Sequence, residues 1–285
     1  MTGQGPNDAT NPAALTDMQV SQIIAAEAGR ILLDLRESFD VGPDAERAND
    51  LRKAADRASH EHIVARFADL RPDDAVLSEE GKDDPIRLES DRVWIVDPLD
   101  GTWEYGQGRV DFAVHIVLWT RDPEAPGGGR LSASTVELPA QGLTRCSEDD
   151  TLPARDLPTD RPVRIVASRT RPPAVLADAV RILDDRLRAN GHESGVEIVD
   201  VGSVGAKVNE ILSGRAEAYV HDTGFYEWDV AAPLAVAHAQ RLTASHVDAS
   251  PIPFNQPTPY VTSLLVGLPV LAEQLRDSMQ QAGSA

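Results

Sequence analysis

The segment WIVDPLDGTWEY, residues 94–105, places Asp97 and Asp100 three positions apart at the end of a run of apolar residues. The apolar run predicts a buried strand, and the Asp-Gly pair at 100–101 predicts a turn. Two carboxylates that are desolvated side by side are costly unless something compensates for their charge. Solvent, an arginine or a cation could do so, and the rest of the chain must decide between them.

Other acidic residues stand where predicted elements begin or end. Glu79 and Glu80 close a short strand predicted for the segment AVLS. Asp229 opens a helix predicted for WDVAAPLAVAHA, where the helix dipole favours an anion in the first turn. Asp56 lies inside another predicted helix. These positions suggest a shared site, although each also has a simpler explanation as solvated surface, as a turn or as a carboxylate at a helix start.

The ligand types point to hard cations. The seven histidines show no metal-ligand spacing and Cys146 stands alone, so oxygen ligands select Mg²⁺, Mn²⁺ or Ca²⁺ over zinc. Two or more such ions bridged by shared carboxylates suit the transfer of a phosphate to water. Gly101 would let the backbone approach a phosphate, and Thr102 would orient the attacking water if Asp56 accepts its hydroxyl proton.

A rival interpretation takes Asp97 as a covalent nucleophile, as in haloacid-dehalogenase-like phosphatases. That chemistry needs the second aspartate two residues after the first. Here the spacing is three, with Pro98 between the two, so this reading is disfavoured.

The composition is that of a globular enzyme rather than a polyanion-binding protein. Of the 285 residues, 41% are hydrophobic and 26% are charged, which is typical of a soluble globular protein. A formal net charge of −19 argues against a nucleic-acid polymer as partner, because phosphate neutralisation needs a basic face. A small phosphorylated substrate stays possible, since cations held by carboxylates supply positive charge.

The single cysteine, Cys146, allows no internal disulfide and fits a cytoplasmic setting. The first 17 residues lack the basic and apolar regions of a signal peptide. No run approaches 18 apolar residues, so no membrane span is predicted.

Hydrophobic periodicity divides the chain into two halves near residues 150–160, with an N-terminal α+β half at 1–155 and a C-terminal α/β half at 156–285. The first half should lay helices against an antiparallel sheet. Its predicted elements are helices at 17–38 and 50–68, separated by a turn at VGPDAER, and strands at 75–80, 93–97, 112–119 and 131–138. The second half should carry helices on both faces of a sheet, with strands at 163–168, 196–201, 216–220 and 263–267 and helices at 173–189, 203–213, 228–240 and 269–281.

Four ordered segments resemble the inositol monophosphatase superfamily of metal-dependent phosphatases: SEE at 78–80, WIVDPLDGT at 94–102, GSVGAKVNEILSG at 202–214 and WDVAA at 228–232. The resemblance implies a layered α/β/α/β/α sandwich, an α/β (α+β) fold that is usually paired as a homodimer, with lithium-sensitive activity. It also implies two or three Mg²⁺ ions, with Mn²⁺ as a possible substitute, held by Glu79, Asp97, the carbonyl of Leu99, Asp100 and Asp229.

The resemblance further implies a catalytic group. Thr102 with Asp56 would activate the water, Glu79 is a further catalytic candidate, and Gly101 with Thr102 would hold the phosphate.

Within the superfamily, the segment KAADRASHEHIV together with VLSEE, DPLDGTWEY and Lys207 looks most like the 3'(2'),5'-bisphosphate nucleotidases. Those enzymes remove the 3'-phosphate from 3'-phosphoadenosine 5'-phosphate, a by-product of sulfate assimilation, to give AMP and phosphate. Ser203 and Lys207 would help to bind the second phosphate or the ribose. The alternative for Lys207 is a solvated cation on a helix.

One position departs from the nucleotidase pattern. His221 stands where such enzymes often carry an arginine, and a largely neutral histidine binds phosphate less firmly. Arg169 would compensate, unless it is a surface cation. Activity on inositol monophosphate or fructose 1,6-bisphosphate therefore remains open, as does a non-catalytic regulatory protein that binds metal or nucleotide.

Overall fold

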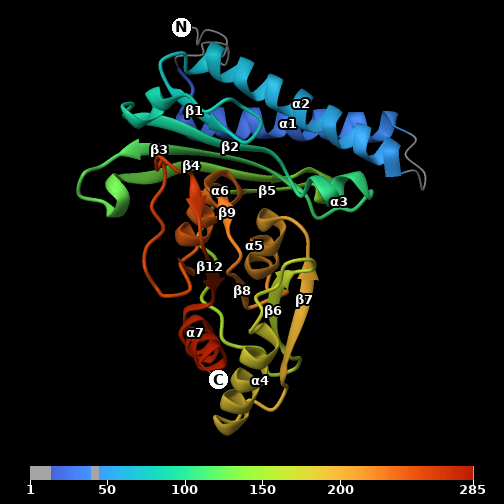
Figure 1. The fold of residues 1–285 in the computed structure, drawn as a ribbon, viewed down its shortest axis with the longest axis vertical. Coiled ribbons are helices and arrows are strands. Elements are labelled where there is room, and N and C mark those ends of the chain that lie inside the picture. Colours follow the sequence, from blue (N-terminus) through green and yellow to red (C-terminus); the bar gives the residue numbers. More distant parts are fainter. Residues whose placement is uncertain (1–13, 40–44, 285) are drawn as a thin grey trace, which may run out of the picture.

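The structure is a computed structural model that describes residues 14–39 and 45–284. The turn predicted at VGPDAER falls largely on residues 40–44, and the expected lack of a signal peptide falls largely on residues 1–13, so both lie outside the described residues. Five layers follow one another in Figure 1, and they form the expected α/β/α/β/α sandwich. Two of these layers are sheets. The helical layers are α1 (Asp17–Ser38) with α2 (Ala45–Leu70), α5 (Val204–Leu212) with α6 (Glu227–Ala239), and α4 (Leu176–Ala189) with α7 (Pro269–Gly283).

The first sheet has five strands in chain order, and only the β1–β2 pair is parallel. The expected antiparallel sheet is confirmed apart from that edge pair. Its strands are β1 (Ala75–Ser78), β2 (Arg92–Asp100), β3 (Ala113–Arg121), β4 (Gly129–Leu138) and β5 (Leu143–Cys146).

Strand β2 separates two hydrophobic cores. Successive side chains on a strand point to opposite faces. Val93 and Ile95 accordingly join the large core that includes α6, whereas Trp94 and Val96 join the core beneath α1 and α2. The strand is buried on both faces, which explains why its sequence is a continuous apolar run and not an alternating one.

The second sheet has the strand order β10-β12-β8-β6-β7. Strand β6 is parallel to both β7 and β8, and β12 and β10 are antiparallel to their neighbours. Helices cover both faces, as expected (Figure 1). The strands are β6 (Val163–Ser168), β7 (Val196–Val201), β8 (Ala218–His221), β10 (Thr243–Ser245) and β12 (Leu264–Gly267).

Several short elements were not predicted, because so few residues show little periodicity unless they form a distinct apolar run. They include β5 and β10, the antiparallel pair of β9 (Phe225–Tyr226) with β11 (Tyr260–Val261), and α3 (Thr102–Gly106). No helix in the described part of the chain has the length and apolar character needed to cross a bilayer.

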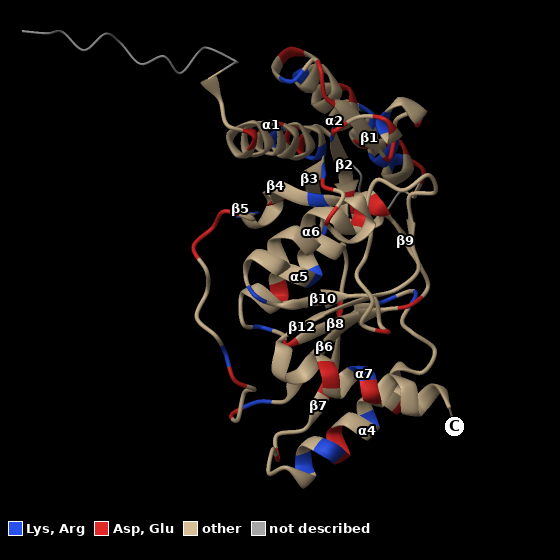
Figure 2. Cartoon of the chain, turned by 90° about the vertical axis from the view of Figure 1, so that its left-hand side faces the viewer, with Lys and Arg blue, Asp and Glu red and all other residues tan. Residues whose placement is uncertain are grey.

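Helix α6 lies with α5 between the two sheets and contacts strands of both. Its middle, from Val230 to Ala237, is buried on all sides and appears almost free of charged residues in Figure 2. A helix that is apolar all round is one that packs on every face. The helix also contacts β2 of the first sheet. Its N-terminal turn carries Asp229, and the end of β2 carries Asp97 and Asp100.

Candidate active site

A pocket of about 400 Å³ opens where the end of β2 meets the starts of α3, α5 and α6 and the ends of β6 and β8. Most of the residues singled out in the sequence line it. The lining consists of Glu79, Asp97, Leu99, Asp100, Gly101, Thr102, Trp103, Glu104, Ser168, Thr170, Arg171, Gly202, Ser203, Val204, Lys207, Tyr219, His221, Phe225 and Asp229.

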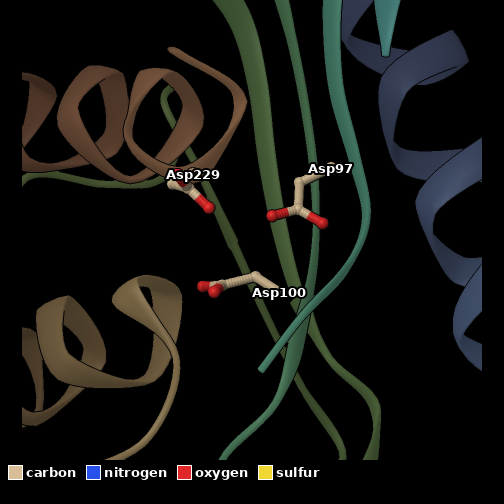
Figure 3. Close-up of side chains that lie close together, drawn as sticks. All are labelled: Asp97, Asp100 and Asp229. Carbon is tan, nitrogen blue, oxygen red and sulfur yellow. The ribbon is translucent and has the colours of Figure 1, made fainter. Parts of the chain in front are cut away.

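Three aspartates converge at one end of this pocket. Oxygen atoms of Asp97, Asp100 and Asp229 lie within 4.8 Å of one another, and Figure 3 shows Asp229 on its helix facing the two aspartates of β2. Residues three apart on a regular strand point to opposite faces. The pairing of β2 with β3 shifts register between Asp97 and Asp100. This irregularity lets both carboxylates face α6.

The backbone around the aspartates fixes their orientation. Asp97 Oδ1 accepts a hydrogen bond from the N–H of Leu99 at 3.0 Å, and Asp100 Oδ2 accepts one from Gly205 at 3.1 Å. Asp229 Oδ2 accepts the N–H of Tyr226 at 2.6 Å, which caps α6. Asp97 Oδ2, in contrast, is buried without any hydrogen-bond partner. A buried carboxylate oxygen that lacks a donor is costly, so it suits a ligand.

Among the described residues, no arginine or lysine forms an ion pair with the cluster. Across residues 14–39 and 45–284, the only ion-pair contact of the three aspartates is His115 Nε2, which lies 3.3 Å from Asp100 Oδ2. Burial lowers the pKa of His115, so this imidazole is neutral near pH 7. Of the three ways to compensate for the charge, an arginine is therefore absent among the described residues, and solvent or a bound cation is left.

The electrostatics of the cluster disfavour a metal-free ionised state. Burial and then Asp229 raise the pKa of Glu79 to about 8. Burial and then Asp100 raise the pKa of Asp229 to about 7. Burial and then Glu79 hold the pKa of Asp97 well above its usual value. An all-oxygen donor set with mutually repelling carboxylates fits a hard divalent cation.

Thr102 stands beside the cluster at the start of α3. Its hydroxyl donates to the carbonyl of Leu99 at 3.0 Å and lies 3.5 Å from Asp56 Oδ1 on α2. Burial and then Glu80 raise the pKa of Asp56 to about 7. Asp56 does not line the pocket itself and reaches it through Thr102.

Gly101 caps α3 in a left-handed conformation with φ 86°. A Cβ atom there would lie only 3.1 Å from Ser203 Cβ and 3.2 Å from the carbonyl of Asp111. The position therefore requires glycine for both its conformation and its surroundings.

The pocket lining also contains the basic residues Lys207 and Arg171, and this part of it is called the cationic end here. Lys207 on α5 is only 5% exposed, which rules out a solvated helix cation. Its Nζ donates to the carbonyl of Gly202 and lies 5.3 Å from the centre of the Tyr219 ring. Burial lowers the pKa of Lys207 to about 8, so it is mostly protonated at neutral pH. Ser203 caps α5 by accepting the N–H of Ala206 at 2.9 Å.

His221 also reaches this end of the pocket. Its Nε2 lies 2.9 Å from the hydroxyl of Thr223, its Nδ1 has no partner, and its ring packs 4.1 Å from that of Phe225. Burial and then Arg171 lower the pKa of His221 to about 4, so the ring is neutral at pH 7.

Arg169 lies outside the pocket lining. Its guanidinium pairs with Glu104 at 3.4 Å, lies 3.9 Å from Asp111, and sits 5.7 Å from the centre of the Trp103 ring. Arg171, two residues further along, lines the pocket instead.

Five further residues line the pocket without having been predicted from the sequence: Arg171, Trp103, Glu104, Tyr219 and Phe225. Trp103 and Glu104 belong to the segment WIVDPLDGTWEY, and Arg171 repeats the arginine two positions earlier. These two features of the sequence could have pointed to the three residues. Tyr219 and Phe225 carried none beyond their place in or near a predicted strand.

A buried polar network anchors the start of α6. Glu227 accepts the N–H groups of Asn255 at 2.6 Å and Gln256 at 2.8 Å. Arg87, 1% exposed, donates to Asp83 at 2.6 Å, to Asn255 Oδ1 at 2.8 Å and to the carbonyl of Gln256 at 3.0 Å. The network thus ties the segment after β1, which carries Glu79, to the helix that carries Asp229.

Comparisons with known proteins show what the whole chain is similar to. The model of the inositol monophosphatase family matches residues 15–282. A 3'-phosphoadenosine 5'-phosphate phosphatase from Mycobacterium leprae (strain TN) is 40% identical over 259 residues, which cover 89% of this chain and 90% of the relative. The 3'(2'),5'-bisphosphate nucleotidase CysQ from Escherichia coli (strain K12) is 31% identical over 233 residues, which cover 78% and 86%.

A solved structure shares the fold. Inositol monophosphatase-II from Staphylococcus aureus MSSA476 superposes with a TM-score of 0.72 at 21% identity, covering 93% of this chain and 96% of the other. The match of the family model over nearly the whole chain decides the classification: the chain belongs to the inositol monophosphatase family.

Proposed function

We propose that this chain is a Mg²⁺-dependent phosphomonoesterase that removes the 3'-phosphate of 3'-phosphoadenosine 5'-phosphate to give AMP and phosphate. The observation that carries the proposal is one pocket that is lined both by a carboxylate cluster and by a buried lysine. A substrate with two phosphates needs both. Relatives at 40% and 41% identity that are named 3'-phosphoadenosine 5'-phosphate phosphatases support the nucleotide over inositol monophosphate or fructose 1,6-bisphosphate.

The acidic end would hold two or three ions, with Mn²⁺ as a possible substitute. The unpartnered Asp97 Oδ2 and the absence of a described basic partner support this assignment. When bound, Mg²⁺ supplies positive charge that stabilises the phosphate oxygens and lowers the pKa of a ligated water. The proposed ligands are Glu79, Asp97, the carbonyl of Leu99, Asp100 and Asp229.

Thr102 and Asp56 would orient the attacking water and take up its proton. The 3.5 Å separation of their oxygens and a pKa of about 7 for Asp56 suit a group that accepts a proton at neutral pH. Glu79, with a raised pKa, is a second candidate for proton transfer. The backbone at Gly101 and Thr102 would hold the scissile phosphate.

Ser203, Lys207 and His221 would contact the rest of the substrate. Lys207 supplies the buried positive charge, and desolvation strengthens its attraction to an anion. His221 is neutral and would act as a hydrogen-bond partner rather than as a charge.

The family resemblance extends the proposal to a cytoplasmic homodimer that is inhibited by lithium and acts on a by-product of sulfate assimilation. A single cysteine in the whole sequence is consistent with a reducing compartment.

The test is a comparison of kcat/KM for 3'-phosphoadenosine 5'-phosphate, inositol 1-phosphate and fructose 1,6-bisphosphate, with and without Mg²⁺ and with added Li⁺. We expect the nucleotide to be the best substrate and phosphate release to need Mg²⁺. A higher kcat/KM for inositol 1-phosphate or for fructose 1,6-bisphosphate would reject the nucleotide assignment. No phosphate release from any of the three would instead favour a non-catalytic binding protein.

A further inference from the structure

A second cavity, of about 310 Å³, lies between the segment that joins β5 to β6, the C-terminal ends of α5 and α6, and the start of α7. It shares no lining residue with the active-site pocket. Its volume lies at the lower end of the range of small-molecule sites. The cavity is therefore a separate place where a small ligand could bind.

Most side chains that line this cavity are apolar. Leu212, Leu242 and Leu268 are buried there. Leu152 and Val270 also line it, and they are 36% and 51% exposed, which places both among the large apolar side chains of the described residues that stay open to solvent. Apolar surface gathered at a concave site favours a ligand that covers it.

Arg155 lines the same cavity without a carboxylate partner among the described residues. It is half-buried, and its guanidinium donates to the carbonyl of Ile211. Glu217 attracts it from a distance, but the oxygens of Glu217 are already paired with Arg161. Burial lowers the pKa of Arg155, as expected for a cation without close compensation. An anionic ligand would supply that compensation.

Arg241 is the second cation at the cavity. It follows α6 with φ 59°, in the left-handed region that normally favours glycine at the end of a helix. The side chain is exposed and forms no hydrogen bond or ion pair within the described part of the chain. Acidic residues outnumber basic ones by 46 to 27 in the sequence, so this arginine is not unpaired for lack of carboxylates.

The walls of the cavity are held in place by hydrogen bonds. Gln240, which is 8% exposed, accepts the N–H of Leu152 at 2.7 Å and donates to the carbonyl of Asp150 at 3.3 Å. These bonds fix the segment after β5, which runs along the outside of the molecule in Figure 2, to the end of α6. A wall that is already in place binds a ligand without the cost of ordering it.

The two kinds of lining together select one class of ligand. The apolar side chains need an apolar body, and two guanidiniums need an anionic group, for which a carboxylate offers two acceptors in the plane of the guanidinium fork. Partial burial strengthens the attraction of Arg155 for such a group.

We propose that this cavity binds a small carboxylate with an apolar body, with Arg155 and Arg241 on the carboxylate and the leucines around the body. The inference goes beyond the proposed phosphatase function and does not depend on it, because the two sites share no residue.

The test uses four probes that separate charge from apolarity: octanoate, octan-1-ol, octylammonium and acetate. Calorimetry on the full chain measures affinity, and heteronuclear NMR locates the site at the amides of Arg155, Leu242 and Val270. We expect octanoate to bind more tightly than each of the other three by roughly 10-fold or more. Octan-1-ol that binds as well as octanoate would reduce the site to an apolar cleft and overturn the assignment.

Variants at the two arginines test the anion contact. Arg241→Gly suits the left-handed backbone, so it should keep or raise the melting temperature while weakening octanoate binding roughly 3- to 10-fold. Arg155→Met should weaken it by about 10-fold, and Arg155→Lys, which keeps the charge, should lie between. Arg181→Met on α4 is the matched control at a 67% exposed arginine, with affinity expected within about twofold. Unchanged affinity in both Arg241→Gly and Arg155→Met would reject the proposal.

Val270→Asp tests the apolar wall. Val270 is exposed in the first turn of α7, where a carboxylate is favourable, so the variant should fold normally but repel octanoate and bind octylammonium better.

Competition and self-association test the other possible occupants. AMP should not displace octanoate, and displacement would place the octanoate in the active-site pocket and overturn the assignment. Sedimentation velocity tests whether a second copy of the chain covers this face. A dimer that Val270→Asp dissociates, with no octanoate bound by wild type, would make the cavity a contact between copies and would also overturn the proposal.

Discussion

The two ends of the pocket are built differently. The carboxylate end takes its groups from a strand and a helix start, and backbone N–H groups fix each aspartate. The cationic end takes Lys207 from α5 and Arg171 from the loop after β6, where the arginine is exposed and has no ion-pair partner in the described chain. A rigid end suits the chemistry of the reaction, and an adaptable end suits the choice of substrate. Variants at the first end should change kcat, and variants at the second should change discrimination between substrates.

The largest expected effect tests the rigid end. Asp229→Asn keeps the acceptor that caps α6 but removes a charge from the cluster, so kcat should fall roughly 10³-fold with little change in fold. Phosphate release measured over a range of Mg²⁺ concentrations checks this result. Asp178→Asn is a matched control, because Asp178 lies in the first turn of α4 but is exposed. Near-normal turnover of Asp229→Asn at saturating Mg²⁺ would remove Asp229 from the ligand set.

Asp56 is the next test, because it acts at the rigid end without lining it. Asp56→Ala should lower kcat about 10²-fold and leave KM nearly unchanged, as for the loss of a general base. Steady-state kinetics with the nucleotide check this split. Asp69→Ala in the same helix is the control, since its side chain is 72% exposed. A change confined to KM would contradict the partnership with Thr102.

A substitution of Arg87 tests whether the carboxylate end depends on the buried polar network that anchors the start of α6. Arg87→Met removes the donor to the side-chain oxygen of Asn255 and to the carbonyl of Gln256. The free energy of unfolding should therefore fall by about 3 kcal/mol. Urea unfolding followed by circular dichroism measures the change. Arg57→Met breaks another i,i+4 pair, with Glu61, but that pair is exposed, and its loss should cost below about 0.5 kcal/mol. Equal changes in the free energy of unfolding for the two variants would show that the buried network contributes no more than an exposed ion pair.

The smallest effect concerns pH. Glu79 and Asp229 have pKa values of about 8 and 7 in the folded chain, above those of the unfolded chain. Between about pH 4 and 8 the folded state therefore binds more protons, and the metal-free protein should lose stability as pH rises. Mg²⁺ needs ionised ligands, so its stabilising effect should grow over the same range. We expect the rise in Tm from EDTA to Mg²⁺ to be larger at pH 8 than at pH 5.5 by more than about 2 °C.

Much of the fold was accessible from the sequence, because long periodic segments dominate it. The helix expected at 17–38 is Asp17–Ser38, and its capping box at Thr16 and Gln19 marks the start. Glu79, Asp97, Asp100 and Asp229 could be singled out because each stands where a predicted element begins or ends. Their convergence followed from the family resemblance, since no local pattern relates Asp229 to Asp97.

The cationic end was less accessible for a physical reason. Whether an arginine is free depends on its partner, and the partner of Arg169 is Glu104, 65 residues away in the chain. Local sequence therefore could not separate Arg169 from Arg171. The burial of Lys207 likewise depends on the packing of α5 between two sheets, which the helical pattern of that segment does not reveal.

The middle position of α6 bears on the protein during its synthesis. The aspartates at 97 and 100 leave the ribosome long before the third one, and α6 must dock against the first sheet before the trio exists. An incomplete chain that ends short of residue 229 would hold Glu79 and two of the three aspartates, but not the complete set of proposed ligands. Phosphatase activity would therefore appear only after residue 229 has been synthesised and α6 has docked. Nascent fragments would not hydrolyse phosphate esters in the cell.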